Sequence, residues 1–282
     1  MRALAEFVMR GRTQASGAAF LGSALPLFSW ISASIVSLVI LRKGSKEGSL
    51  VLLWAILPLA ASYYLVGDSS ALIALIGTAI LAMILRSSIS WELTLLAAVL
   101  LASMGSWIFQ LSAVQIVTSI IDWYLDMVSQ LESDLQVPTP EQARRAFLAY
   151  FAMGQAYLMV LLLILARWWQ SKLFNPGAFG QEFRQLRMSP GVSQGLLLVN
   201  AGCVLFSDQF GMWLGLLTLP FVMSATGFLY WYFQWRGWSG KWFTYYYLAM
   251  VFFFMPMCVL LVALALVDSL MNLRKRIELK EG

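Results

Sequence analysis

The chain has 282 residues, of which 60% are hydrophobic and only 12% are charged. Soluble proteins carry about 25% charged and about 45–50% apolar residues, so this composition excludes an ordinary soluble domain. Because a spanning helix needs about 20 apolar residues, we expect an all-α polytopic membrane protein with about eight or nine transmembrane helices or half-helices. The net charge of +5 is typical of basic loops at a membrane surface, and we expect the lipid bilayer, not nucleic acid, as a partner.

The residue types that the sequence lacks limit the catalytic and metal-binding sites that the chain can form. The chain has no histidine, and its two cysteines, Cys203 and Cys258, lie inside apolar runs. Buried cysteines of this kind usually act as small hydrophobic side chains, and two of them cannot build a thiolate metal site. No P-loop, G-x-S-x-G or H-E-x-x-H motif occurs. We therefore expect no catalytic residue, no metal, no cofactor and no enzymatic activity.

The first apolar stretch carries no charge from Ala15 to Leu41, and Pro26 divides it. It is either one kinked helix or a hairpin of two short helices. Basic residues flank both sides, at 2–12 and 42–48. The positive-inside rule places both flanks in the cytoplasm, which favours the hairpin.

An amphipathic helix is predicted in segment 111–141, after apolar runs at 49–66, 71–85 and 93–109. Its apolar stripe consists of Ile116, Ile120, Trp123, Met127, Leu131 and Leu135, and its polar stripe of Asp122, Asp126, Ser129 and Ser133. No Lys or Arg occurs between residues 87 and 143. We expect this acidic segment to lie on the membrane at its periplasmic side.

The second half begins with an apolar run at 144–165 and a polar, basic loop at 167–190, which we expect in the cytoplasm. Three further apolar runs follow at 192–206, 212–233 and 242–267, and three complete spans there would leave the basic tail outside. We therefore expect one span, near 207–209 or Pro220, to be re-entrant and the tail to be cytoplasmic. The predicted organisation is a single integral membrane domain, 1–282, with N-terminal helices at 15–110, C-terminal helices at 144–267 and a basic tail at 268–282.

Small residues at four-residue spacing open the membrane part, at Ala15, Ala19 and Ser23. In lipid, such faces let two helix backbones approach closely. They are either a docking face for a partner subunit or a packing face within the chain.

Uncharged polar residues fall inside apolar runs, where unpaired polar groups are costly. They are Gln155, Tyr157, Asn200, Ser224 and Thr226. They predict one of two arrangements. Either they line a neutral ligand-binding cavity between the sixth, seventh and eighth apolar segments (144–165, 192–206 and 212–233), or they form separate hydrogen bonds between helices. No span carries a charge near its centre, which argues against proton coupling within the chain.

Two further segments have a distinctive composition. The aromatic block 230–238 is typical of an interfacial belt, with a lipid-headgroup or ligand-stacking site as the alternative. The cytoplasmic loop predicts a structured interfacial segment, or a partner contact, without a nucleophile beside a base. Its characteristic residues are Trp168, Trp169, Asn175, Pro176, Gly177, Glu182, Phe183 and Arg184.

The chain resembles the YybS-like family of predicted membrane proteins of unknown function. The resemblance rests on these loop residues with Gln185-Leu186-Arg187, on the ending Asp268 to Arg276, and on Leu25-Pro26-Leu27 before Arg42-Lys43-Gly44. That family is distantly similar to the S components of energy-coupling-factor transporters and to the rod-shape protein MreD. The first likeness implies a small-molecule or lipid binding or transport component of the bacterial inner membrane, with Ala15, Ala19 and Ser23 against a coupling subunit. The second implies an envelope scaffold. The extra C-terminal spans depart from a six-helix S component.

The topology can be tested with single cysteines. In a chain whose own cysteines are replaced by serine, Lys172→Cys and Ser133→Cys should react with a membrane-impermeant thiol reagent from opposite sides, because the charge rule places loop 167–190 inside and segment 111–141 outside. Labelling of both positions from the same side contradicts this topology.

Overall fold

The computed structural model describes residues 2–25, 28–130 and 137–281. Within these ranges every regular element is a helix and no strand occurs. The chain divides into two compact units, Met1–Pro176 and Gly177–Gly282. The sequence predicts a single integral membrane domain, 1–282, with C-terminal helices at 144–267, and this organisation stays a prediction. In the structure the helix that begins at Pro140 packs with the N-terminal helices, because its apolar surface is covered by them.

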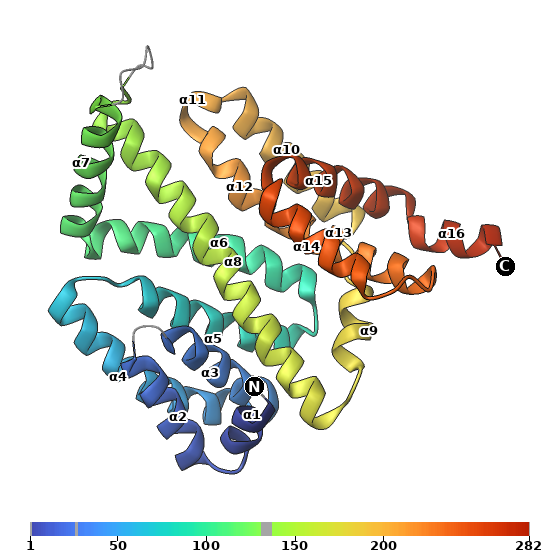
Figure 1. The fold of residues 1–282 in the computed structure, drawn as a ribbon, viewed down its shortest axis with the longest axis horizontal. Helices are drawn as coiled ribbons and strands as arrows, with labels where there is room; N and C mark the ends of the chain where they lie inside the picture. Colours follow the sequence, from blue (N-terminus) through green and yellow to red (C-terminus); the bar gives the residue numbers. More distant parts are fainter. Residues whose placement is uncertain (1, 26–27, 131–136, 282) are drawn as a thin grey trace. The chain divides into compact units, whose positions relative to one another are not determined.

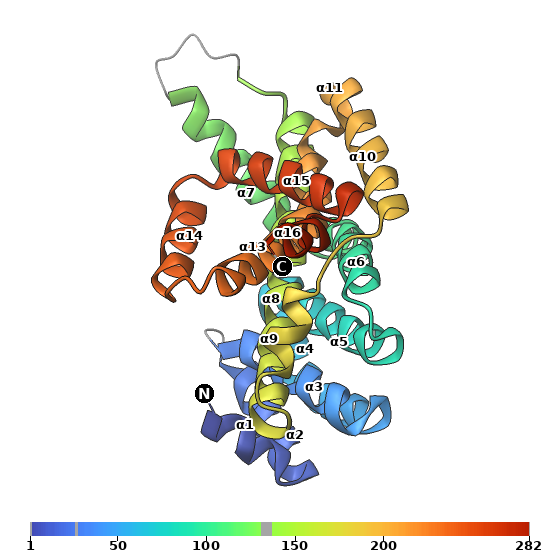
Figure 2. The same ribbon diagram turned by 90° about the vertical axis from the view of Figure 1, so that its right-hand side faces the viewer.

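The helices of the two units are shown in Figures 1 and 2. In the described part of the first unit they are α1 (Arg2–Met9), α2 (Arg12–Ala24), α3 (Ser29–Lys43), α4 (Ser45–Val66), α5 (Ser70–Ser88), α6 (Trp91–Ser112), α7 (Val114–Gln130) and α8 (Pro140–Phe174). In that of the second unit they are α9 (Ala178–Arg184), α10 (Pro190–Leu205), α11 (Ser207–Phe210), the 3₁₀ helix η2 (Gly211–Trp213), α12 (Leu214–Leu217), α13 (Leu219–Trp235), α14 (Lys241–Phe252), α15 (Phe254–Met271) and α16 (Leu273–Glu281).

Six segments of the described chain are long and apolar enough to cross a membrane: Ser45–Val66, Ser70–Ser88, Trp91–Ser112, Pro140–Phe174, Gly211–Trp235 and Phe254–Met271. They confirm a multi-pass, all-helical membrane protein. The expected number of eight or nine includes half-helices, and α10 is apolar but too short to cross alone. Residues 242–267, expected as one run, form two helices that meet at Phe253.

Helix α3 forms the centre of the first unit. It packs against α2, α4, α5 and α8, and every residue from Ser32 to Leu41 is buried. Three of these residues are serines, and each donates a hydrogen bond to a carbonyl of a different helix. The bonds are Ser32 Oγ to Ala19 O of α2 (2.8 Å), Ser34 Oγ to Leu162 O of α8 (3.1 Å) and Ser37 Oγ to Thr78 O of α5 (3.4 Å). Every serine hydroxyl on this helix segment is therefore satisfied inside the protein.

The carboxyl end of α3 is closed by side chains from α5 and α8. Arg86 Nη1 donates to Ile40 O at 3.1 Å and to Leu41 O at 2.6 Å. Gln170 Nε2 donates to Leu41 O at 3.3 Å. Ile40 O also accepts the Gly44 N–H at 3.0 Å, whereas Leu41 O is one of the last carbonyls of the helix and takes its donors from these two side chains.

The uncharged stretch forms a hairpin, as the flanking basic residues predicted. Helices α2 and α3 have 13 and 15 residues, or about 20 and 22 Å, which is shorter than the roughly 30 Å hydrocarbon layer. Their backbones approach closely at Gly22, where a Cβ atom would lie 2.5 Å from Ser32 Oγ. Residues 26–27 of the turn lie outside the described residues.

The small-residue face of α2 points into this hairpin. Ala15, Ala19 and Ser23 are 1%, 0% and 4% exposed, and α2 packs on α3 and α4. A partner subunit cannot reach these three side chains in this structure. The face therefore packs within the chain, which is the second of the two alternatives, because α3 and α4 already cover it.

Helix α4 lies at the rim of the first unit. Its buried residues, Gly48, Val51, Ala55 and Leu59, form one narrow stripe. Its other faces expose large apolar side chains, which is the pattern of a helix with one side against protein and the rest against lipid. Pro58 lies inside the helix, and its ring has no N–H to donate to Trp54 O, one turn earlier.

Helix α7 is amphipathic, as predicted. Its apolar residues form two faces, of which one packs against protein and the other is exposed. Val117 and Ile121 are buried, and α7 packs against α8. The predicted stripe is more exposed, with Ile120 at 37%, Trp123 at 66% and Met127 at 41%. An exposed apolar stripe on such a helix suits contact with a membrane surface. Leu131, Ser133 and Leu135 of the predicted stripes lie outside the described residues.

The close contact of α2 generates a prediction. Ala19→Leu adds three heavy atoms where α2 meets its neighbours and should lower the stability of the protein by about 1–3 kcal/mol through overpacking. Ala24→Leu is the matched control, because Ala24 is exposed on the same helix. The measurement is the thermal midpoint of the purified protein in detergent. Equal midpoints for the two variants would show that Ala19 is not tightly packed.

Candidate functional site

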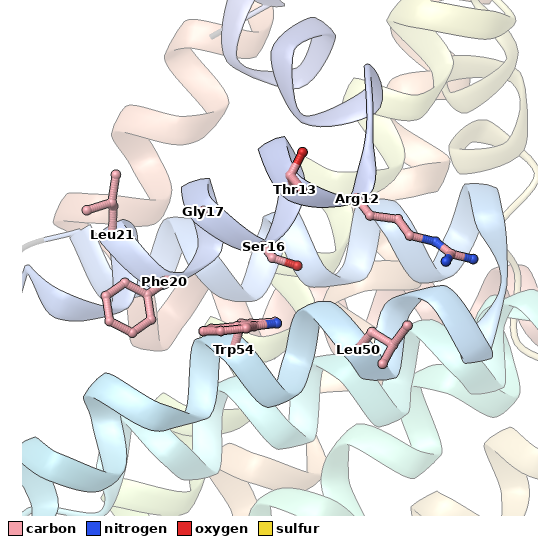
Figure 3. A pocket seen from close by; sticks show the side chains of 8 residues that line it. All are labelled: Arg12, Thr13, Ser16, Gly17, Phe20, Leu21, Leu50 and Trp54. Carbon is pink, nitrogen blue, oxygen red and sulfur yellow. The ribbon is translucent and has the colours of Figure 1, made fainter.

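A groove runs along the outside of the first unit between α2 and α4 (Figure 3). Its volume is about 490 Å³, and its surface is mostly apolar. The lining residues are Arg12, Thr13, Ser16, Gly17, Phe20 and Leu21 of α2 with Leu50 and Trp54 of α4. Two contacts show that the helices run side by side in the same direction. Arg12 pairs with Glu47 near the starts of both helices, and Phe20 meets Trp54 further along.

One end of the groove is polar. Arg12 Nε donates to Glu47 Oε2 at 2.6 Å, and its Nη2 donates to Glu47 Oε1. Lys43 lies close enough to Glu47 to interact electrostatically with the carboxylate. Two cations face one carboxylate, so this end keeps a net positive charge. Helix α2 also begins here without a side-chain cap, which leaves first-turn N–H groups for a ligand or water.

The other end of the groove is apolar. The rings of Phe20 and Trp54 meet edge to face at 6.4 Å, as the close-up in Figure 3 shows. Gly17 forms part of the floor, and a Cβ atom added to it would meet no atom within 4 Å. A second apolar hollow of about 500 Å³ on the other side of α2 shares Thr13, Gly17 and Leu21 with the groove. The exposed face of α2 therefore has open space on both sides.

Of the five polar residues predicted to bind a ligand, two belong to the first unit. Gln155 is 8% exposed and lines a small pocket of about 150 Å³ with residues of α3 and α5. Its Oε1 atom has no hydrogen-bond partner among the described residues. Tyr157, two residues later in α8, is half-buried.

The other three belong to the second unit. Asn200 Nδ2 donates to Leu196 O of its own helix at 2.8 Å. Thr226 Oγ1 bonds to Val222 O at 2.7 Å and to the Tyr246 hydroxyl at 2.6 Å, which links α13 to α14. Ser224 is buried. The bond of Thr226 to Tyr246 is of the helix-to-helix kind, the bond to Val222 lies within α13, and a single cavity shared by all five residues stays a prediction.

The aromatic block 230–238 packs largely on itself and on α14. Tyr230 lies 4.2 Å from Phe243 between ring centroids, and Trp238 lies 4.4 Å from Trp242. The hydroxyls of Tyr230 and Tyr247 are 2.8 Å apart. These rings stack on each other, so they hold α13 and α14 together.

The loop motif between Trp168 and Arg184 is a set of turns and packing contacts. Trp169 is buried and Trp168 is 37% exposed. After Pro176, Gly177 adopts a left-handed conformation (φ +89°) from which α9 begins, and glycine is the residue that takes this conformation without strain. Phe183 packs edge to face on Tyr230 at 5.6 Å. Glu182 and Arg184 flank Phe183 on α9.

The sequence analysis missed an arginine cluster in the second unit. Arg187 Nε donates to Asp268 O at 3.0 Å, and Nη2 donates to Ser269 O at 2.6 Å. Arg274 Nε donates to Asp268 Oδ2 at 3.2 Å, and its two other nitrogens donate to Leu186 O (2.7 Å) and to Arg184 O. Burial lowers the pKa of Arg274, and the Asp268 carboxylate opposes that shift. The signal in the sequence was the single acidic residue at the end of the last apolar run, with three basic residues shortly after it.

No group of three or more potential metal-binding side chains of the His, Cys, Asp or Glu type occurs among the residues that the structure describes. Cys203 is half-buried on α10 and Cys258 is buried on α15, both as free thiols.

The chain matches no family model, no curated protein and no solved structure. The resemblance to the YybS-like family therefore stays a hypothesis that rests on the residues quoted for it.

The arginine cluster generates a prediction. Arg274→Gln leaves the buried Asp268 carboxylate without its ion-pair partner and should destabilise the protein by about 3 kcal/mol. Arg276→Gln is the control, because Arg276 is exposed two residues later. Thermal unfolding in detergent measures both. If the double variant Asp268→Asn/Arg274→Gln is no more stable than Arg274→Gln alone, the unpaired carboxylate is not the cause.

Proposed function

We propose that this protein is a membrane-embedded lipid-binding component of the bacterial inner membrane. In this proposal one phospholipid occupies the groove between α2 and α4. Its phosphate lies at the Arg12 end, and an acyl chain lies along Gly17, Phe20 and Trp54. The observation that carries the proposal is a groove with one charged end and one apolar end on a face that is turned to lipid.

The charge at the polar end supports a phosphate-bearing headgroup. Arg12 and Lys43 together outweigh Glu47 by one positive charge, which matches the single negative charge of a phosphodiester. Basic sites between helices on the cytoplasmic side are the usual binding sites for anionic headgroups. The uncapped start of α2 adds N–H donors of the kind that bind phosphate.

The shape of the apolar end supports an acyl chain. The groove has about 490 Å³ of space, within the usual range of about 300–1,000 Å³ for ligand sites. Leu50, Phe20 and Trp54 provide apolar walls, and Gly17 leaves the floor open. An unbranched chain can lie along a groove between two helices that run in the same direction.

The alternative, an envelope scaffold, is supported by the second hollow on the other side of α2. A partner helix could lie on the exposed face of Thr13, Gly17 and Leu21, since these three residues line both hollows. The two functions compete for the same surface, so one experiment separates them.

The experiment fills the groove from its floor. Gly17→Leu places a side chain in open space, so the fold should persist, while a steric penalty of about 1.4 kcal/mol or more lowers lipid affinity at least about tenfold. The measurement is native mass spectrometry of the protein released from nanodiscs, which counts retained phospholipid. Gly154→Leu is the matched control, because Gly154 is an exposed helical glycine with no atom near its Cβ position.

The proposal requires that wild type and Gly154→Leu retain one phospholipid and that Gly17→Leu does not. Equal retention by all three proteins contradicts it. Retention of another protein chain by the wild type, lost in Gly17→Leu, supports the scaffold instead.

A further inference from the structure

A phospholipid carries two acyl chains, and the α2–α4 groove holds one of them in the function proposed above. The second hollow, on the other side of α2, has nearly the same volume as the groove, about 500 Å³ against about 490 Å³. A water molecule takes up about 30 Å³ and a methylene group is of similar size, so each space holds roughly sixteen such groups. Each of the two spaces is therefore large enough for one long acyl chain.

The lining of the second hollow suits an acyl chain and does not suit a headgroup. Leu4 and Phe7 of α1 and Ile31 of α3 line it together with α2. Its polar side chains, Thr13 and Gln14, are uncharged, and among the described residues no ionisable side chain lines it. A phosphate in this hollow would lack a charged partner, which is costly. An acyl chain there must therefore belong to a lipid whose headgroup lies outside the hollow.

The groove and the second hollow meet along one ridge of α2. Thr13, Gly17 and Leu21 line both spaces and lie one helical turn apart on the same face (Figure 3). The ridge is lowest at Gly17, which has no side chain and where a Cβ atom would meet nothing within 4 Å. Its two neighbours divide between the spaces, because Ser16 lines only the groove and Ala18 lines only the second hollow. A molecule that forks near Gly17 can thus place one branch on each side of α2.

The charged end of the groove lies at the beginning of both spaces. Arg12 lines the groove, and Thr13, the next residue, lines both the groove and the second hollow. We infer that one phospholipid sits astride α2, with one acyl chain in the groove and the other in the second hollow. With its phosphate at Arg12, the glycerol lies beside Thr13 and both chains run along α2 toward the hairpin turn.

This assignment rests on the proposed function and specifies its substrate class. The α2 surface selects lipids by the number of their acyl chains as well as by the charge of their headgroups. A lipid with one chain leaves either the groove or the second hollow to other lipid tails, which pack there without a fixed position.

The test compares two phosphatidylglycerols that differ only in carrying two acyl chains or one. The full-length protein is placed in phosphatidylcholine nanodiscs with equal small amounts of both forms, and native mass spectrometry identifies the retained lipid by its mass. The wild type should retain one lipid per protein chain. It should prefer the two-chain phosphatidylglycerol at least about threefold, because the second chain adds van der Waals contacts in the second space.

Ser16→Trp and Ala18→Trp form a matched pair, since both residues are half-buried neighbours of Gly17 and each lines one space. Each variant fills one space and leaves the other for a single chain. Both should therefore still retain the one-chain form and lose the two-chain preference. Ile31→Trp enters the second hollow from α3 and should repeat the result of Ala18→Trp, whether or not Ala18→Trp folds. Gly154→Trp is the control and should keep the preference, because Gly154 lines neither space.

The outcomes separate this assignment from the function on which it rests. A wild type that retains no phospholipid contradicts the proposed function itself. Equal retention of the two forms by the wild type leaves the proposed function standing and overturns the assignment, as does a two-chain preference that survives both Ala18→Trp and Ile31→Trp. Retention of two phospholipids per wild-type chain also overturns it, because separate lipids would then occupy the two spaces.

Discussion

Where a helix is surrounded by other helices inside an apolar layer, its hydroxyl groups have no water to bond with and must find partners in the protein. Helix α3 meets this requirement in three directions, since its serines bond to carbonyls of α2, α8 and α5. The bonds fix the rotation of α3 against each neighbour. They also fix α2, which lies between the groove and the second hollow, and α3 itself, which is one wall of that hollow. Both spaces therefore depend on one short helix.

The second unit solves the same problem with arginine. Arg187 donates to carbonyls at the end of α15, Arg274 donates to carbonyls at the end of α9, and the Asp268 carboxylate balances part of their charge. Serine suits the closely packed centre of the first unit because it is small. Arginine suits the end of a span because it reaches carbonyls of two segments that are about 80 residues apart in the chain.

The sequence predicted those features that depend on local pattern and on charge. The hairpin followed from a proline between two basic flanks, and the amphipathic helix from its opposite stripes. The sequence did not predict contacts between distant segments, because the spacing of Ser32, Ser34 and Ser37 does not indicate which helices surround them. The break at Phe253 was missed because an uninterrupted apolar run looks the same whether one helix or two cross it. Gln155 was chosen for its polarity, but only the packing around it separates an unpaired amide from one bonded to a neighbour. The groove was not foreseen either, since open space beside Gly17 is a property of two helices together.

The proline inside α4 has a mechanical consequence. Without the N–H of Pro58, the helix lacks one rung of its hydrogen-bond ladder at the carbonyl of Trp54, and a helix bends most easily at such a point. Trp54 belongs to the wall of the groove, while Ala55 and Leu59 keep that stretch anchored to the unit. A small bend would move the indole relative to Phe20 and leave the buried stripe in place. A bend at Pro58 would therefore change the width of the groove. The same two helices would then accommodate acyl chains of different cross-section.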